Sequence, residues 1–169
     1  MVCLVSRQGR ELQRYNKGRR LVVGCIPYRN KKGSNEELEV LLVSSQKSPK
    51  MMFPKGGWEL DESIEQAATR ESLEEAGVLG KIESQLGRWS FLSKRYGTLY
   101  EGYMFPLLVT EQLEFWPEQH ARQRTWMSVE EARDKCQHWW MKEALDILVN
   151  RIQCTRLQPQ AQEQAAALA

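Results

Sequence analysis

Three glutamates in the middle of the chain have the residue type and the spacing to do chemistry. Glu71, Glu74 and Glu75 stand at positions i, i+3 and i+4, so a helix places their carboxylates on one face. Like charges at this spacing destabilise an isolated helix by roughly 0.2–0.5 kcal/mol per pair, and such a run is typical of a solvated helix face. A bound cation is the alternative, because Mg²⁺ takes carboxylate oxygens and leaves room for substrate phosphates.

The residues around the glutamates favour the cation. Gly56 is followed after five residues by Glu62 and after seven more by Arg70-Glu71, and the stretch closes on Gly77-Val78. This frame resembles the Nudix box, Gly-x5-Glu-x7-Arg-Glu-U-x-Glu-Glu-x-Gly-U with U apolar, and Ser72 is its one departure. The resemblance implies an α/β/α sandwich with a mixed β-sheet, and a hydrolase whose cofactor is Mg²⁺ or alternatively Mn²⁺.

The resemblance also implies a division of labour within the box. The expected metal ligands are Glu71, Glu75 and the backbone carbonyl of Lys55 or Gly56. Glu74 is expected to deprotonate or orient the attacking water, and Arg70 to orient the carboxylates. Nudix enzymes differ in which glutamate is the base, and some take it from a later loop.

The substrate class has to be inferred from outside the box. Residues 17–126 resemble the diphosphoinositol polyphosphate phosphohydrolases, which also cleave diadenosine polyphosphates, and in particular their plant relatives; Lys17-Gly-Arg-Arg20 and Phe53-Pro-Lys-Gly-Gly are among the matching pieces. In that family a basic segment, a Ser-Ser turn and later arginines surround a highly phosphorylated ligand. The phosphate contacts implied here are Arg19, Arg20, Ser44, Ser45 and Arg122 or Arg124, with Lys94 and Arg95 compensating for Gln46, where the animal enzymes usually have an arginine.

We therefore expect hydrolysis of the diphosphate group of a diphosphoinositol polyphosphate, a small-molecule partner. The enzymatic alternative is a diadenosine penta- or hexaphosphate or another nucleoside diphosphate derivative. A different class of function is a non-catalytic protein that binds inositol pyrophosphates. An RNA-decapping or RNA-binding role is disfavoured, because the net charge of the chain is only +2.

The glutamates need a helix packed on both sides to position them. Ser63 with Gln66 three residues on is a capping-box pattern that begins this helix, and Gly77 ends it. Its apolar stripe of Ile64, Ala67 and Ala68 leads into the glutamates, and Thr69, Leu73 and Ala76 form a second, opposite stripe. A helix of this kind places its carboxylates at the edge of a cleft.

Strands and helices around this helix follow the order of an α/β sandwich. Strands are expected over residues 20–28 and 38–44 as a hairpin, with Pro27 near the end of the first, and over 81–92, 98–110 and 122–127. Further helices should begin at Ser128 and near Trp139-Trp140, whose rings we assign to the core. Cys25 is expected to be a small core residue with a free thiol.

The whole chain has the composition of one soluble domain, since 169 residues can bury a normal core. We expect a basic arm over residues 1–17, the hydrolase domain over 18–154 and a disordered low-complexity tail over 155–169. The arm is expected to meet an anionic ligand, with a mitochondrial transit segment as the minority alternative. A cytoplasmic or nuclear monomer is expected, without nucleic-acid or membrane partners.

Overall fold

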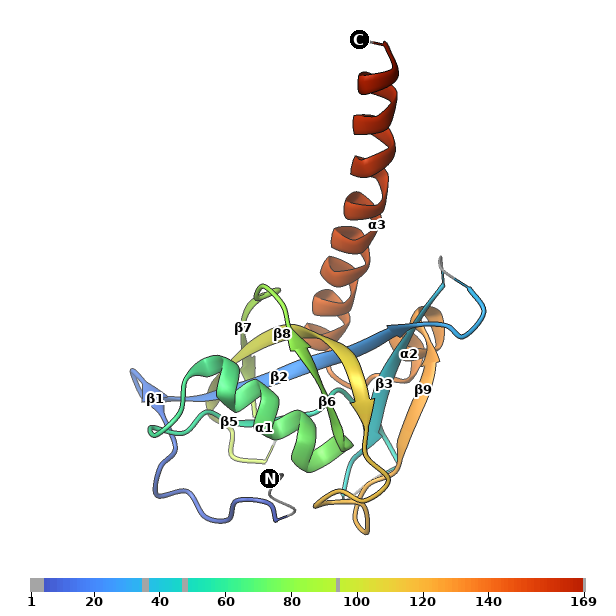
Figure 1. Ribbon diagram of the computed structural model, residues 1–169. Coiled ribbons are helices and arrows are strands. Elements are labelled where there is room, and N and C mark those ends of the chain that lie inside the picture. The colour runs from blue at the N-terminus through green and yellow to red at the C-terminus, as the bar shows by residue number, and fades with distance from the viewer. Residues whose placement is uncertain (1–4, 35–36, 47–48, 94, 169) are drawn as a thin grey trace.

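The computed structural model describes residues 5–34, 37–46, 49–93 and 95–168, and a mixed β-sheet forms its centre (Figure 1). Strand β2 (Arg19–Asn30) runs parallel to β8 (Leu99–Gln112), from the pair Arg20 and Tyr100 to the pair Tyr28 and Leu108. Strands β3 (Leu38–Ser44) and β6 (Val78–Ile82) flank this pair as antiparallel neighbours. The shorter strands, also antiparallel, are β1 (Tyr15–Asn16) and β5 (Lys55–Gly57) on β2, β4 (Met51–Met52) and β9 (Arg124–Ser128) on β3, and β7 (Gly87–Leu92) on β8.

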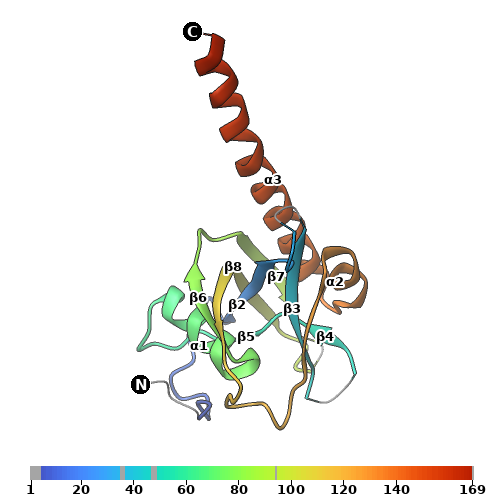
Figure 2. The same cartoon turned by 45° about the vertical axis from the view of Figure 1, so that its right-hand side comes forward.

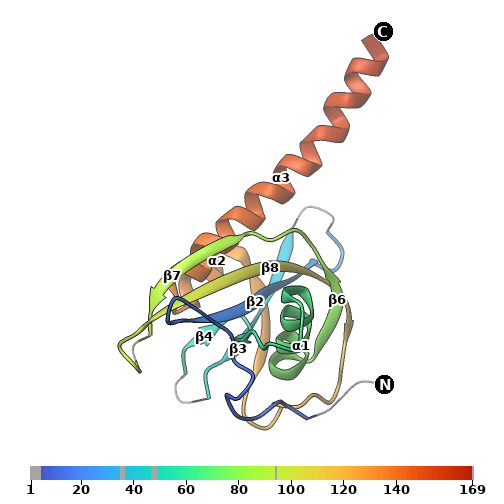
Figure 3. The same ribbon diagram turned by 90° about the vertical axis from the view of Figure 1, so that its left-hand side faces the viewer.

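Helices cover both sides of the central strand pair. Helix α1 (Ile64–Ala76) lies on one side of β2 and β8, and the beginning of α3 (Trp139–Leu168) lies on the other (Figures 1 and 3). The short helix α2 (Val129–Lys135) stands beside α3 at the β3–β9 edge (Figure 2). The expected α/β/α sandwich with a mixed sheet is confirmed.

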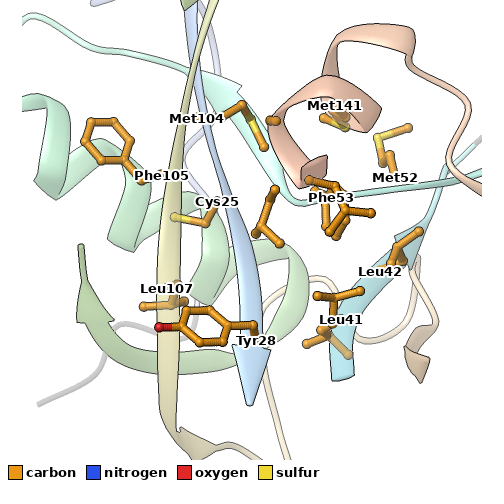
Figure 4. Packing of buried hydrophobic residues seen from close by; sticks show 14 of the residues in the cluster. Cys25, Tyr28, Leu41, Leu42, Met52, Phe53, Met104, Phe105, Leu107 and Met141 are labelled. Carbon is orange, nitrogen blue, oxygen red and sulfur yellow. The ribbon is translucent and has the colours of Figure 1, made fainter. Parts of the chain in front are cut away.

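The apolar core fills the space between the sheet and these helices. In Figure 4, Met141 of α3 lies toward Phe53 and Met52, whereas Cys25 lies toward α1. Cys25 is fully buried with a free thiol, as expected, and its Sγ lies 3.5 Å from the carbonyl oxygen of Ala68 in α1. Full burial of one large apolar side chain stabilises the fold by about 1.5–3 kcal/mol, so this core fixes α1 firmly against the sheet.

Three expectations about the elements need correction. Pro27 does not end the first strand, because β2 pairs with β5 up to Gly24 and with β3 from Tyr28; Pro27 lies where the strand changes partners, and its missing N–H is tolerated there. Residues 83–86 interrupt the stretch expected as one strand over 81–92.

The two tryptophans of α3 also differ from each other. Trp140 is a core residue with 1% exposure, but Trp139 is 54% exposed, because consecutive residues of a helix point about 100° apart. Helix α3 extends to Leu168 and projects away from the sheet (Figure 1), and the disorder expected for the tail stays a prediction. In the part of the chain that the structure describes, no helix is long and apolar enough to cross a membrane.

Candidate active site

Helix α1 holds the three glutamates as the sequence predicts. The Ser63 side chain accepts a hydrogen bond from the Gln66 amide while the Gln66 side chain accepts one from Ser63, and Gly77 ends the helix in the left-handed conformation at φ 64°. Glu71, Glu74 and Glu75 are only 8%, 5% and 5% exposed. This glutamate cradle, as we call the three residues, is therefore not a solvated helix face.

Arg70 fixes one side of the cradle. Its Nη1 donates to Glu71 Oε1 at 2.8 Å and to Glu74 Oε2 at 3.0 Å. Its Nε and Nη2 donate to the two oxygens of Glu62 at 2.9 and 2.7 Å, and Nη2 also donates to the Gly57 carbonyl. A planar guanidinium with donors on several edges suits this task, and the geometry supports the orienting role predicted for Arg70.

A second set of donors faces Glu75. The Lys55 backbone N–H donates to Glu75 Oε2 at 3.1 Å, and Arg122 Nη2 lies 3.2 Å from Glu75 Oε1. Lys55 and Gly56 belong to β5, which pairs with β2 and brings the predicted metal-binding carbonyls next to α1. The elements that position the predicted ligands are therefore β5 and the C-terminal half of α1.

Gly56 approaches the cradle so closely that a side chain there would have to displace the Glu71 carboxylate. A Cβ at this position would lie 2.1 Å from Glu71 Oε1. The Ser72 departure from the box pattern is also accommodated, because its buried hydroxyl donates to the Ala68 carbonyl at 2.9 Å. The backbone of β5 and helix α1 therefore pack closely together at the Glu71 carboxylate.

The electrostatics of the cradle favour a cation. Burial, and then the neighbouring charge of Glu75, raise the pKa of Glu71 to about 8. Burial also raises the pKa of Glu75 to about 7, although Arg122 and Lys55 oppose this shift. Burial alone would raise the pKa of Glu62, but hydrogen bonds from Arg70 hold it below its ordinary value. Two buried carboxylates that resist ionisation together are a donor set that a divalent ion would stabilise.

The donor set fits Mg²⁺ or Mn²⁺ by its chemistry, since it consists of carboxylate and carbonyl oxygens. Among the described residues, however, no group of three acidic, histidine or cysteine side chains converges closely enough to hold an ion as it stands. Arg70 contacts one oxygen of Glu71, and Arg122 and the Lys55 amide contact the two oxygens of Glu75.

Glu118 is a fourth carboxylate at the site that the sequence does not single out. It lies in the loop between β8 and β9, and its N–H donates to the Glu74 carbonyl at 3.0 Å. Its carboxylate accepts hydrogen bonds from Arg122 and Gln46, each at 3.0 Å. The loop after β8 carries two acids, Glu114 and Glu118, and nothing in their spacing shows which one reaches α1.

The N-terminal segment was also missed as part of the site. The Arg7 backbone N–H donates to Glu74 Oε1 at 2.6 Å, and its guanidinium contacts Glu59 and Asp61 at 2.5 and 2.8 Å. Ser6 Oγ donates to Glu118 Oε2 at 3.2 Å. Figure 2 shows this segment and the β8–β9 loop near α1. The sequence signal was the basic character of the arm, which predicted an anionic ligand rather than contacts with the protein's own carboxylates.

Three of the predicted phosphate contacts lie against hydroxyl or aromatic side chains. Arg19 donates to Ser90 Oγ at 3.0 Å, Arg20 lies 5.5 Å from the centre of the Tyr100 ring, and Arg95 lies 5.2 Å from that of Tyr96. Arg10, which was not predicted, stacks on Tyr96 at 5.0 Å. We call Arg10, Arg19, Arg20 and Arg95 the arginine patch. Lys94 falls outside the described residues.

The arginine patch is distinguished by its lack of acidic partners. Within the described parts of the chain, none of its four guanidiniums forms an ion pair with a carboxylate, whereas Arg7, Arg70 and Arg122 all do. Gln13 connects the patch to the cradle: Arg20 Nε donates to Gln13 Oε1 at 2.8 Å, and the same side chain lies against Gly57. A cluster of unpaired arginines next to a carboxylate site is suited to a polyanion that carries a metal ion.

A cavity of about 440 Å³ lies at a separate place and is lined by Ser44, Ser45 and Arg122, together with Gln119 and His120. Arg124 lies elsewhere: it donates to the carbonyls of Ala76, Gly77 and Leu113 and stacks 3.8 Å from the Trp116 ring centre. These contacts hold the end of α1 to the β8–β9 loop. They favour a structural role for Arg124 over the predicted phosphate contact.

Comparisons with known proteins show the family of this chain. A family model described as the NUDIX domain matches residues 18–147. Nudix hydrolase 18, mitochondrial, from Arabidopsis thaliana is 66% identical over 168 residues, covering 97% of this chain and 96% of that protein. Nudix hydrolase 17, mitochondrial, of the same plant is 65% identical, covering 96% and 92%. The mouse diphosphoinositol polyphosphate phosphohydrolase 3-alpha is 40% identical over 111 residues, covering 64% and 63%.

Solved structures support the fold. The Caenorhabditis elegans Ap4A hydrolase, in a binary complex, superimposes with a TM-score of 0.61 at 21% identity, covering 78% of this chain and 96% of that one. A NUDIX hydrolase from Nitrosomonas europaea gives a TM-score of 0.63 at 23% identity, covering 76% and 86%. At these identities the likeness concerns the fold alone.

The names of the two plant relatives correct one expectation. Both are described as mitochondrial, so the prediction of a cytoplasmic or nuclear protein is wrong, and the transit alternative for the Arg-rich segment is favoured. The resemblance inferred from the box, by contrast, is confirmed by the family match and by these relatives. Nudix hydrolases generally use divalent metal ions and act on phosphoanhydrides of small molecules. By its box, its fold and its relatives, this chain belongs to the Nudix hydrolase family.

Proposed function

We propose that this hydrolase removes the terminal phosphate from the diphosphate group of a diphosphoinositol polyphosphate. The observation that carries the proposal is the arginine patch beside the glutamate cradle. Arg10, Arg19, Arg20 and Arg95 have no carboxylate partners among the described residues, and Gln13 links Arg20 to the loop that carries Gly57. Bidentate arginine–phosphate bonds are strong and selective, so several such residues hold a densely phosphorylated ring.

The chemistry follows from the residues of the cradle. Glu71, Glu75 and the carbonyl of Lys55 or Gly56 would hold the Mg²⁺ or Mn²⁺ ion, which supplies charge neutralisation and a more acidic bound water. Glu74 accepts the proton of the attacking water, and Arg70 holds the glutamates in place. The water oxygen forms a bond to the terminal phosphorus, the phosphoanhydride bond breaks, and the inositol phosphate leaves with the bridging oxygen.

A dinucleoside polyphosphate is the second candidate substrate. The mouse relative is named for diphosphoinositol polyphosphates, whereas a structural neighbour is named for Ap4A. Tyr96, 47% exposed between two arginines, offers an aromatic face on which a nucleobase could stack. The number of arginines in the patch favours the inositol substrate, because a dinucleotide spreads its charge along a chain.

The relatives also support a mitochondrial location for this protein. We propose that it acts there as a monomer on a small molecule, without a nucleic-acid or membrane partner.

A substrate panel tests the proposed reaction. Diphosphoinositol polyphosphates, diadenosine penta- and hexaphosphate, ADP-ribose and NADH are compared at fixed Mg²⁺ by phosphate release and chromatography. We expect the highest kcat/KM for the diphosphoinositol polyphosphate. A large preference for ADP-ribose or NADH would contradict the proposal, and a preference for diadenosine polyphosphates would establish the second candidate.

Glu75→Gln separates an enzyme from a binding protein. The substitution removes a metal-binding charge and should lower kcat about 10²–10³-fold, with substrate affinity retained in calorimetry. Arg20→Ala is the matched variant for the patch, and it should raise KM while changing kcat little. Absence of turnover in the wild type with either metal, combined with tight binding of inositol pyrophosphates, would favour the non-catalytic alternative.

A further inference from the structure

The first described residues of the chain reach the active-site helix from outside the matched family domain, which begins at residue 18. The Arg7 amide donates to Glu74 Oε1 at 2.6 Å, and its guanidinium contacts Glu59 Oε2 at 2.5 Å and Asp61 Oδ1 at 2.8 Å. Glu59 is buried at 6% exposure. One residue of the arm therefore touches both the glutamate cradle and the loop that precedes α1.

These contacts close a ring of hydrogen bonds around the box. The Arg7 guanidinium binds Glu59, whose N–H donates to Glu62 Oε1 at 3.0 Å. Glu62 accepts from Arg70, and Arg70 donates to Glu74 Oε2 at 3.0 Å. The Arg7 amide then returns to the other oxygen of Glu74. Each member of the ring is held from two directions, so the loop and the helix cannot shift independently.

The orientation of the Glu74 carboxylate depends most on this ring. Arg70 alone cannot fix it, because the same guanidinium also serves Glu62, Glu71 and the Gly57 carbonyl. With Arg7 on one oxygen and Arg70 on the other, the plane of the Glu74 carboxylate is defined while each oxygen keeps a further lone pair for a water molecule. Groups that orient a reactive carboxylate in this way are typically worth 10–100-fold in activity.

We propose that Arg7 is a positioning residue: its guanidinium anchors the arm on Glu59 and Asp61, and its backbone amide holds Glu74 in the orientation needed to receive a proton from water. The role rests on the proposed hydrolysis, but the contact itself does not. Arg7 touches neither the arginine patch nor Glu71 and Glu75, so its contribution concerns the rate of the chemical step rather than substrate or metal binding.

Three variants and one control test the proposal. Arg7→Ala removes the anchor, deletion of residues 2–8 removes both anchor and amide, and Arg7→Lys keeps a single-point contact with the acids. Gln8→Ala is the control, since Gln8 is exposed in the same arm and is not a member of the ring. We expect kcat to fall about 10–100-fold in Arg7→Ala, at least as much in the deletion, and less in Arg7→Lys. KM and the melting temperature should stay near the wild-type values in all of them.

A measurement without substrate makes the test independent of the proposed function. In protein labelled with ¹³C at the glutamate carboxyls, the Glu74 signal is assigned by its loss in Glu74→Gln. This signal should move in Arg7→Ala and in the deletion and stay in place in Gln8→Ala. If the wild type turns over no substrate of the panel, the proposed function fails while the signal still decides the role of Arg7.

Three results would overturn the inference. An unchanged Glu74 signal together with unchanged kcat in the deletion would mean that the arm does not position Glu74. A higher kcat in the deletion would mean that the arm obstructs the site. A rise in KM with constant kcat would assign Arg7 to substrate binding and would equally reject the positioning role.

Discussion

At the residue scale, two consecutive glycines, Gly56 and Gly57, leave no free space for a methyl group. A methyl group at position 56 would lie 2.1 Å from Glu71 Oε1, and one at position 57 would meet the Gln13 amide at 1.7 Å. In both cases the end of a flexible side chain must move. The consequences differ, because one displaced group, Glu71, is a proposed metal ligand and the other, Gln13, is not.

Gly56→Ala should therefore weaken metal binding and lower kcat by about 10²-fold or more, with only a small loss of thermal stability. Gly57→Ala is the matched control and should leave the affinity for Mn²⁺, measured by calorimetry or electron paramagnetic resonance, close to that of the wild type. Equal loss of Mn²⁺ affinity in both variants would contradict the assignment of Glu71 as a ligand.

The buried carboxylates also predict a pH dependence of stability. The folded, metal-free protein holds protons on Glu71 and Glu75 up to pKa values of about 8 and 7, because burial disfavours their charges. In the unfolded chain these groups release their protons near pH 4.5. Their contribution to stability is therefore fully present below pH 4.5 and is lost as the pH rises through 7 to 8.

Thermal unfolding without metal should accordingly show a melting temperature that falls between pH 5 and 8. Mg²⁺ requires the ionised carboxylates, so its stabilising effect should be small at pH 5 and largest near pH 8. The double variant Glu71→Gln, Glu75→Gln should flatten both trends. A metal-free protein that becomes more stable over this range would contradict the prediction.

At the scale of the elements, α3 divides into a packed and a projecting part. Trp140, Met141, Ala144, Leu145 and Leu148 are buried, and Arg151 donates to the carbonyls of Ser84 and Gln85. Beyond this region the helix leaves the body of the protein (Figures 1 and 3). Pro159 lies inside the projecting part, and a proline in a helix interior costs about 3 kcal/mol. Disorder of this tail in solution stays our prediction.

Truncation after Leu157 should consequently change the melting temperature by only about 1–2 °C, since the buried residues of α3 all precede this point. Truncation after Asn150 is the comparison, because it also removes Arg151 and Ile152 and should lower stability clearly. Rapid hydrogen exchange over residues 158–168 would support the prediction. Slow exchange there, or a large loss of stability in the shorter truncation, would show that the projecting helix is part of the folded unit.

At the scale of the whole molecule, the basic arm belongs to the active site as much as to any targeting signal. The chain forms a backbone hydrogen bond from Leu60 to Leu12 and another from Arg14 to Trp58, so the arm is tied to the loop before α1. A presequence that is removed after import cannot include residues that the mature enzyme needs. This sets a limit on where processing can occur.

Protein imported into isolated mitochondria should therefore keep an N-terminus at or before Ser6. Mass spectrometry of the recovered protein measures this directly, and the form that begins at Gly9 serves as the low-activity reference. Recovery of a fully active enzyme that begins after Arg7 would contradict both this limit and the positioning role of Arg7.

The sequence by itself determined the elements whose signals are local. Spacing along one helix identified Glu71, Glu74 and Glu75, and capping residues predicted the limits of α1 at Ser63 and Gly77, because both depend only on residues a turn apart. The alternation of strands and helices predicted the mixed sheet. The same local reasoning failed at Pro27, because the neighbouring strands decide where β2 ends. It failed at Trp139, because the direction of the side chain decides whether the ring is buried.

Only the tertiary structure decided which distant residues complete the site. Arg7 and Glu118 lie 67 and 44 positions from Glu74 in the chain, and they reach it because the arm and the β8–β9 loop converge on α1. Arg10 belongs to the arginine patch because it stacks on Tyr96, whereas Arg124 donates its hydrogen bonds to backbone carbonyls. A charged side chain in a sequence has no assigned partner, because its partner is fixed by packing; the fold therefore decided which basic residues remain available for a substrate.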